Sequence, residues 1–203
     1  MQPFDDADIN TFMGASIAVP TRSIYMGSVE AVGGQAGGET DGEPGTDFRM
    51  AERLIKGIHI LDSINHEPIT VHMNNFGGDE YHGLGIYDSI ITAKSAVDIK
   101  VYGHAMSMGS VILQAGRRRL MMPNSTVMVH MGRIETFIDQ RDIKANTKEW
   151  ERINDLISNI YLNRMREKNP RYSMNQLKDL LSTDRYLSPT EAVEIGLADE
   201  VIV

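Results

Sequence analysis

The sequence predicts an α/β fold in which strands alternate with helices. Short apolar runs rich in β-branched residues, such as residues 68–73 and 97–102, are typical of strands. Between them, residues 79–94 carry apolar side chains at helical spacing. The chain has 203 residues, of which 41% are hydrophobic, and this suits a single domain over residues 1–203 with a sizeable core. Repeated β-α-β units are therefore expected.

The first half of the chain shows this alternation most clearly. Residues 15–27 hold two short apolar runs, which predict an early strand or strand pair. Residues 48–65 place Met50, Leu54 and Ile58 on one face of a helix. The elements expected next are a strand at 68–73, a helix at 79–94, a strand at 97–102, a short apolar helix at 108–114, and strands at 119–122 and 127–129.

The second half is expected to be mainly helical. Trp150, Ile153 and Ile157 mark one face of a long helix over about residues 142–167. A shorter helix is expected over about residues 173–181, with a serine as its cap.

The last helix and strand carry the clearest start signal in the sequence. Ser188 stands at the N-cap, Pro189 at the first helical position and Glu191 at the third, which is a typical helix start. Residues 198–203 are predicted to form the closing strand.

A glycine-rich segment interrupts the pattern near the start. Residues 33–47 contain too few apolar side chains to bury surface of their own, so a mobile surface loop is predicted. A phosphate-binding loop would end in lysine followed by serine or threonine, and that ending is missing here.

Composition excludes several classes of protein. The chain has no cysteine, which rules out disulfides, thiol nucleophiles and cysteine-bound zinc. Its formal net charge is −8, and the run Arg117-Arg118-Arg119 is too short to suggest nucleic-acid binding. No apolar run approaches the ~20 residues that span a bilayer. The acidic start lacks a charged and apolar leader, so a soluble cytoplasmic protein is expected.

Ser107 is the first candidate for chemistry. A strand ending in small residues runs into this serine, and a short apolar helix follows. Free N–H groups and the helix dipole at such a place stabilise negative charge, so the N–H of Met108 could meet an oxyanion formed by attack of Ser107. Serine is also a favoured helix cap, and the local sequence leaves both interpretations open.

A second oxyanion donor could come from the Gly77-Gly78 pair. The pair follows a predicted strand and precedes a predicted helix, and glycine lets the backbone approach a ligand closely. An ordinary strand-to-helix turn would look the same in the sequence.

A serine nucleophile needs a base and a group that orients the base. Of the six histidines, His130 ends the apolar run at residues 127–129, at a strand tip where catalytic groups often lie. No two histidines have the H-x-x-x-H spacing of a helical metal site, so no metal is predicted. Asp184 precedes the last capped helix and could orient His130, although nothing local separates it from the other acidic residues.

Taken together, these segments resemble the ClpP family, the proteolytic subunits of the caseinolytic (Clp) proteases. The resemblance runs from about residue 17 to residue 203 and consists of motifs in a fixed order. In order, these are Asn74-Asn75-Phe76-Gly77-Gly78 for N-S-P-G-G; Gly85-Ile86-Tyr87-Asp88 for a closed-up G-x-x-I-Y-D; Gly103 to Gly109 for G-x-x-x-S-M-G; Met122 to His130 for L-P-N-S-x-x-M-I-H; and Asp184 to Ser188 with Glu191 to Asp199 for the closing D-R-x-F/L-S and E-A-x-x-Y-G-L-V/I-D.

The resemblance implies a Ser107–His130–Asp184 triad, with the backbone of Gly78 and Met108 as oxyanion donors. It also implies a crotonase-like ββα spiral fold and no cofactor. The implied assembly is a homo-oligomer of two stacked heptameric rings, in which the helix at about 142–167 forms the ring-to-ring handle. Substrates would be unfolded polypeptides or peptides, delivered by a possible AAA+ unfoldase.

Some segments depart from the family pattern. Met131 to Glu135 stand where Q-P-x-G-G is usual, Ser182-Thr183 replace an acidic–basic pair, and the segment before residue 15 does not match the family's axial loops. The alternatives are a non-catalytic ring subunit, a crotonase-type acyl-CoA enzyme, and a binding module without activity.

Overall fold

The computed structural model describes residues 5–27, 45–132 and 141–202. The helices in these ranges are α1 (Asp6–Ala15), α2 (Phe48–Ile64), α3 (Glu80–Thr92), α4 (Met108–Leu113), α5 (Ile143–Lys168), α6 (Met174–Leu181) and α7 (Pro189–Glu194). The strands are β1 (Ile17–Ala18), β2 (Ser23–Met26), β3 (Ile69–Asn75), β4 (Val97–Met106), β5 (Arg119–Met121), β6 (Thr126–Val129), β7 (Arg185–Leu187) and β8 (Glu200–Val201).

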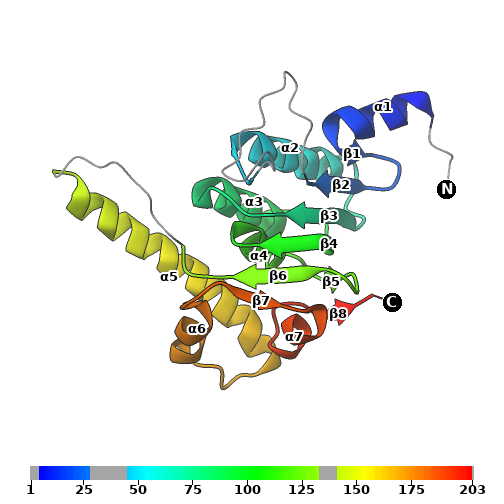
Figure 1. Cartoon of the computed structure of the whole chain (residues 1–203). Helices are drawn as coiled ribbons and strands as arrows, with labels where there is room; N and C mark the ends of the chain where they lie inside the picture. Colours follow the sequence, from blue (N-terminus) through cyan, green and yellow to red (C-terminus); the bar gives the residue numbers. More distant parts are fainter. Residues whose placement is uncertain (1–4, 28–44, 133–140, 203) are drawn as a thin grey trace.

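A central sheet confirms the α/β fold class. Strands β2, β3 and β4 are parallel neighbours, while β1 runs antiparallel to β2 at one edge. The long β4 divides the sheet, because its first half pairs with β5 and its second half with β6. Strand β8 extends the first branch, and β7 extends the second in antiparallel register. The strands stack one above another in Figure 1, with helices behind and beside them.

The predicted helices form where their sequence signals stand. Asp47 and Asp79 cap α2 and α3 by accepting backbone N–H bonds from Met50 and His82. Ser188 forms a capping box with Glu191 at the start of α7, as the sequence predicts. The buried face of α2 includes Met50, Leu54 and Ile58, also as predicted.

Helix α5 has two dissimilar halves. Its first residues, 143–148, are all exposed, and Figure 1 shows this end projecting away from the sheet. Its second half buries Tyr161, Leu162 and Met165 in the core. The helix is thus anchored to the core by its later part, while its first turns make no contact that buries them.

The structure corrects several expected boundaries. Strand β4 continues to Met106 rather than ending at residue 102, and the closing strand covers only Glu200–Val201. Helix α1 was not expected, because most of its side chains are exposed and no apolar face marks it. Strand β7 was not expected either, since two of its three residues are exposed.

The expected loop at 33–47 lies mostly outside the described residues. Its last part is not on the surface, because Thr46 is only 2% exposed and pairs with Gly78. No helix in the described ranges is long and apolar enough to cross a membrane.

Candidate functional site

Ser107 lies at the sharp turn between β4 and α4. Its backbone has φ 48° and ψ −123°, in a region that side chains other than glycine rarely adopt. A hydrogen bond from its N–H to the carbonyl of Met128 on β6 holds the turn in place. The Ser107 hydroxyl makes no capping bond to α4. The helix-cap interpretation is therefore wrong, and the strained turn directs the hydroxyl elsewhere.

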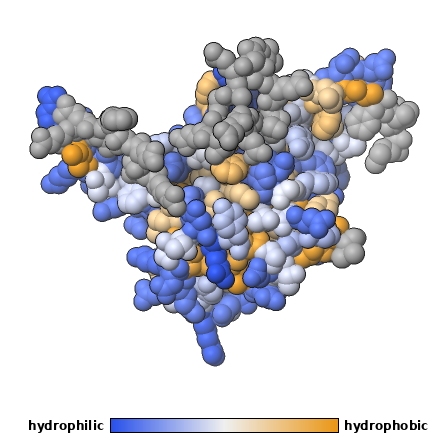
Figure 2. All heavy atoms as spheres, viewed as in Figure 1, coloured by the Kyte–Doolittle hydropathy of each residue, from blue (hydrophilic) through white to orange (hydrophobic). Residues whose placement is uncertain are grey.

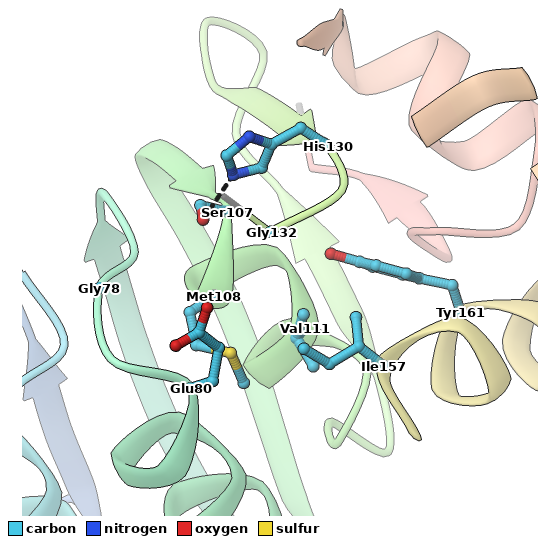
Figure 3. A pocket seen from close by; sticks show the side chains of 9 residues that line it. All are labelled: Gly78, Glu80, Ser107, Met108, Val111, His130, Gly132, Ile157 and Tyr161. Carbon is cyan, nitrogen blue, oxygen red and sulfur yellow. Dashed lines mark hydrogen bonds between the residues drawn. The ribbon is translucent and has the colours of Figure 1, made fainter. Parts of the chain in front are cut away.

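The Ser107 hydroxyl lies next to the imidazole of His130. Strands β4 and β6 are parallel, with Met106 opposite Met128, so the residues that follow them meet at one edge of the sheet. The Ser107 Oγ atom lies 2.8 Å from Nε2 of His130, as the dashed line in Figure 3 marks. The two residues predicted as nucleophile and base thus lie within hydrogen-bonding distance.

Asp184 reaches the other side of the same imidazole. Strand β7 runs antiparallel to β6 and pairs Arg185 with Val129, which places the preceding Asp184 beside His130. Asp184 Oδ1 lies 3.2 Å from His130 Nδ1, and the two side chains are 37% and 18% exposed. The buried Nδ1 nonetheless makes no well-directed hydrogen bond within the described residues. The distance fits an ion pair, while the angle falls short of a hydrogen bond.

The Gly77-Gly78 turn packs directly against Ser107. Both glycines have positive φ, 109° and 140°. A Cβ on Gly77 would lie 2.6 Å from the Ser107 Cβ and 3.0 Å from the Met108 nitrogen. A side chain is therefore excluded at Gly77, and its absence lets the turn approach the start of α4.

The side chain of Asn75 holds this turn by hydrogen bonds. It is almost fully buried, and its Oδ1 accepts hydrogen bonds from the Gly77 N–H and the Thr46 hydroxyl. The Thr46 backbone then pairs with the Gly77 carbonyl and with the Asp79 N–H. Gly78 lies between Gly77 and Asp79, and its own N–H takes no part in this pairing with Thr46.

A small depression lies beside Ser107. It has a volume of about 20 Å³, roughly that of one water molecule. The lining residues are Gly78, Glu80, Ser107, Met108, Val111, His130, Gly132, Ile157 and Tyr161 (Figure 3). The predicted oxyanion donors Gly78 and Met108 therefore border the same depression as Ser107 and His130.

Tyr161 supports the site from α5. Its hydroxyl lies 2.6 Å from the Ser110 Oγ, and Ser110 in turn donates to the carbonyl of Ser107 at 2.6 Å. Burial raises the pKa of Tyr161, although the bond with Ser110 opposes the rise. The phenol therefore remains a neutral hydrogen-bonding group that fixes the first turn of α4.

Several residues of the site were missed from the sequence. Ile157 was assigned to one face of the long helix, and Tyr161 falls within the same predicted helix, but nothing indicated that this helix reaches Ser107. Asn75 lies before the glycine pair and Glu80 lies after it. The sequence signal that could have pointed to Glu80 was an acidic residue soon after that turn. The sequence departs from the family pattern at residues 131–135, and residues 133–135 of this segment lie outside the described ranges.

No three histidine, aspartate or glutamate side chains in residues 5–27, 45–132 and 141–202 form a group that could hold a metal ion. The polar side chains beside Ser107 are the imidazole of His130 and the carboxylates of Asp184 and Glu80.

Comparison with known proteins gives one family. The family model described as Clp protease matches residues 43–203, which include every residue of the site. A curated protein of Deinococcus radiodurans, the ATP-dependent Clp protease proteolytic subunit, is 35% identical over 159 residues. The match covers 77% of this chain and 76% of that relative.

Proposed function

The chain belongs to the Clp protease family, and we propose that it is a serine endopeptidase with Ser107 as its nucleophile. The observation that carries this proposal is the 2.8 Å contact between Ser107 Oγ and His130 Nε2 at a strained strand-to-helix turn. A serine hydroxyl needs such a base to become nucleophilic. The family match supports a protease subunit, and the geometry supports these residues as its reacting groups.

The mechanism follows from the positions of the three side chains. His130 Nε2 takes the Ser107 proton as Oγ attacks the peptide carbonyl, and Asp184 stabilises the imidazolium that forms. The N–H groups of Met108 and Gly78 stabilise the oxyanion of the tetrahedral intermediate. The imidazolium then protonates the leaving amine as the C–N bond breaks. Water, deprotonated by His130, releases the acyl group and restores Ser107.

The proposed assembly is a pair of stacked heptameric rings that enclose the sites, on a crotonase-like ββα spiral subunit. The exposed start of α5 supports this, because a helix anchored at one end offers its free end to another subunit. Figure 2 shows hydrophobic surface near the start of α5 and over α1, where Ile143, Ile9 and Met13 are exposed. An AAA+ unfoldase would supply unfolded chains to such a chamber.

One observation favours a second possibility, a ring subunit without activity. Nδ1 of His130 lacks a directed bond to Asp184, and a misoriented imidazole would be a poor base. Apo sites often show such loose geometry, so we retain the active enzyme as the proposal. A crotonase-type acyl-CoA enzyme would not need the Ser107–His130 contact.

Peptide hydrolysis tests the proposal. Wild-type protein should cleave short fluorogenic peptides, while Ser107→Ala and His130→Ala should lose activity by at least about 10³-fold. Light scattering should give both variants the same mass as the wild type, many times that of the 22.6 kDa chain. Full activity in Ser107→Ala would remove Ser107 as nucleophile, and a monomeric mass would remove the ring model.

A further inference from the structure

The depression beside Ser107 contains a carboxylate that the proposed mechanism does not use. Glu80 is the first residue of α3 and lines the depression together with Ser107 and His130. Its position at a helix N-terminus stabilises its negative charge. In Figure 3 its carboxylate oxygens lie on the side that faces Ser107. No lysine or arginine of the described residues is paired with it.

The space next to Glu80 is kept open by a glycine. A Cβ on Gly132 would lie 3.4 Å from Glu80 Oε1 and 3.6 Å from Asn154 Oδ1. The same point lies 4.0 Å from Trp150 Nε1, a buried N–H without a hydrogen-bond partner in the described residues. Because Gly132 has no side chain, the two acceptor oxygens and the Trp150 edge lie with no Cβ between them, next to the depression that Gly132 and Glu80 line.

The rest of the depression is apolar. Met108, Val111 and Ile157 line the walls between Ser107 and helix α5. The depression itself has room for about one water molecule, so a substrate side chain would lie over its open mouth and not enter it. Such a side chain needs an apolar stem to contact these walls and a positive head to reach Glu80. Lysine and arginine have this composition, since their methylene stems pack on apolar surface while their charged ends find polar partners.

The cation next to Trp150 and Asn154 in the sequence is already paired with a carboxylate. Arg152 on α5 donates to both carboxylate oxygens of Glu149, at 2.8 Å and 2.6 Å. Glu149 also accepts from Tyr81, so this ion pair is held in a network of its own. Arg152 is thus paired with Glu149, and the described residues hold no ion pair to Glu80.

We propose that Glu80 is a specificity-determining residue that selects lysine or arginine on the amino side of the scissile bond. The inference rests on the proposed peptidase function of Ser107. The ammonium or guanidinium group would donate to Glu80, with Asn154 Oδ1 as a second acceptor. An acidic side chain in the same place would face the Glu80 carboxylate and be rejected.

Paired active-site probes test this choice directly. Diphenyl aminophosphonates react when a serine oxygen attacks phosphorus and displaces phenoxide, so the rate reports how the side chain of the probe fits. We expect the lysine-like probe to modify Ser107 at least about tenfold faster than the leucine-like probe, the range of one charge-assisted hydrogen bond. Glutamine-like and glutamate-like probes should be slower than the lysine-like probe.

Two variants isolate the charge of Glu80. Glu80→Gln should lower the lysine-to-leucine rate ratio by about tenfold, and Glu80→Lys should favour the glutamate-like probe instead. Asp88→Asn removes one negative charge from an exposed position on the same helix and should leave the ratio unchanged. A ratio that is the same in wild type and Glu80→Gln would overturn the proposal.

The outcomes also separate this inference from the proposed function. If every probe modifies Ser107 but none is preferred, only the role of Glu80 fails. If the glutamine-like probe is fastest, Asn154 and Trp150 rather than Glu80 set the preference, which also contradicts the proposal. If no probe modifies Ser107, the proposed function fails with it.

Discussion

A Cβ added to Gly77 would lie 2.6 Å from the Cβ of Ser107, so the turn before α3 and the turn before α4 are in direct contact. The two turns come from neighbouring parallel strands, β3 and β4, which end at the same edge of the sheet. Gly78 follows Gly77 in this turn and lines the same depression as Ser107. The proposed catalysis therefore depends on the shape of the glycine turn as much as on the side chains.

Gly77→Ala should strongly reduce peptidase activity. The substitution is strained at φ 109° and would also push the Cβ into Ser107 and the Met106 carbonyl. We expect kcat to fall by at least about 10²-fold, the scale of losing one oxyanion donor. Gly85→Ala is the matched control, because its Cβ would meet only Ile55 at 3.8 Å. Equal activities in the two variants would contradict the role given to the turn.

Asn75→Ala should weaken both stability and catalysis. The change leaves the Gly77 N–H and the Thr46 hydroxyl without their acceptor in a buried place, at a cost of about 1–3 kcal/mol in the free energy of unfolding. Thr46→Val removes one of these two bonds and leaves the bond to Gly77. We expect thermal midpoints to fall in both variants and kcat to fall mainly in Asn75→Ala. The reverse pattern of kcat would argue that Thr46 holds the turn.

Tyr161→Phe should destabilise the protein by about 1 kcal/mol, since it removes the hydroxyl that bonds Ser110 but keeps the ring. Tyr186→Phe removes a hydroxyl that is on the surface, where the residue is 59% exposed, and should shift stability by less than about 0.5 kcal/mol. Thermal unfolding at one fixed protein concentration measures both. A larger shift in Tyr186→Phe would contradict the supporting role of Tyr161.

The Arg119–Asp199 pair predicts a pH dependence of stability. Burial alone would raise the pKa of Asp199, but its hydrogen bonds from the Arg119 side chain and backbone outweigh this and lower the pKa. A carboxyl with a lowered folded-state pKa stabilises the fold above the ordinary carboxyl pKa near 3.9, and this contribution is lost as pH falls through the lowered value. Asp199→Asn should therefore be less stable than wild type at neutral pH, with a difference that vanishes in acid.

The size of that effect follows from the burial of the pair. Arg119 is 3% exposed and Asp199 is 38% exposed, so we expect a loss of about 2 kcal/mol, less than for a fully buried pair. Glu200→Gln breaks the exposed pair with Arg118 and should change stability by at most about 1 kcal/mol. A difference for Asp199→Asn that stays constant as the pH is lowered through the whole acid range would contradict the assignment of the effect to its ionisation.

Local sequence signals predicted some elements well. Ser188, Pro189 and Glu191 fixed the start of α7 because a capping box involves residues only three apart. Helix α1 carries a comparable signal in the Asp5–Asp8 capping box, but its side chains are mostly exposed and gave no apolar face to recognise. Strand β7 could not be predicted from the sequence, because it is held by pairing with β6 and shows no alternation of apolar and polar residues.

In the candidate site, too, some features follow from the sequence and others depend on tertiary contacts. Local sequence could not separate a capping serine from a nucleophile at Ser107, since both stand before a helix, and the family resemblance chose between them. The structure adds the backbone angles and the missing cap bond. The sequence shows an acidic residue after the glycine turn, but not that Glu80 lies near Gly132 and Asn154, because tertiary packing alone brings these residues together.

The most direct test of the central claim is covalent labelling by a fluorophosphonate, followed by peptide mapping. The probe should add once per chain, on Ser107, and the adduct should be absent in Ser107→Ala and strongly reduced in His130→Ala, where no base can take the proton. Labelling of Ser107→Ala to the same extent as wild type, or no labelling of intact wild-type oligomer, would contradict Ser107 as the nucleophile.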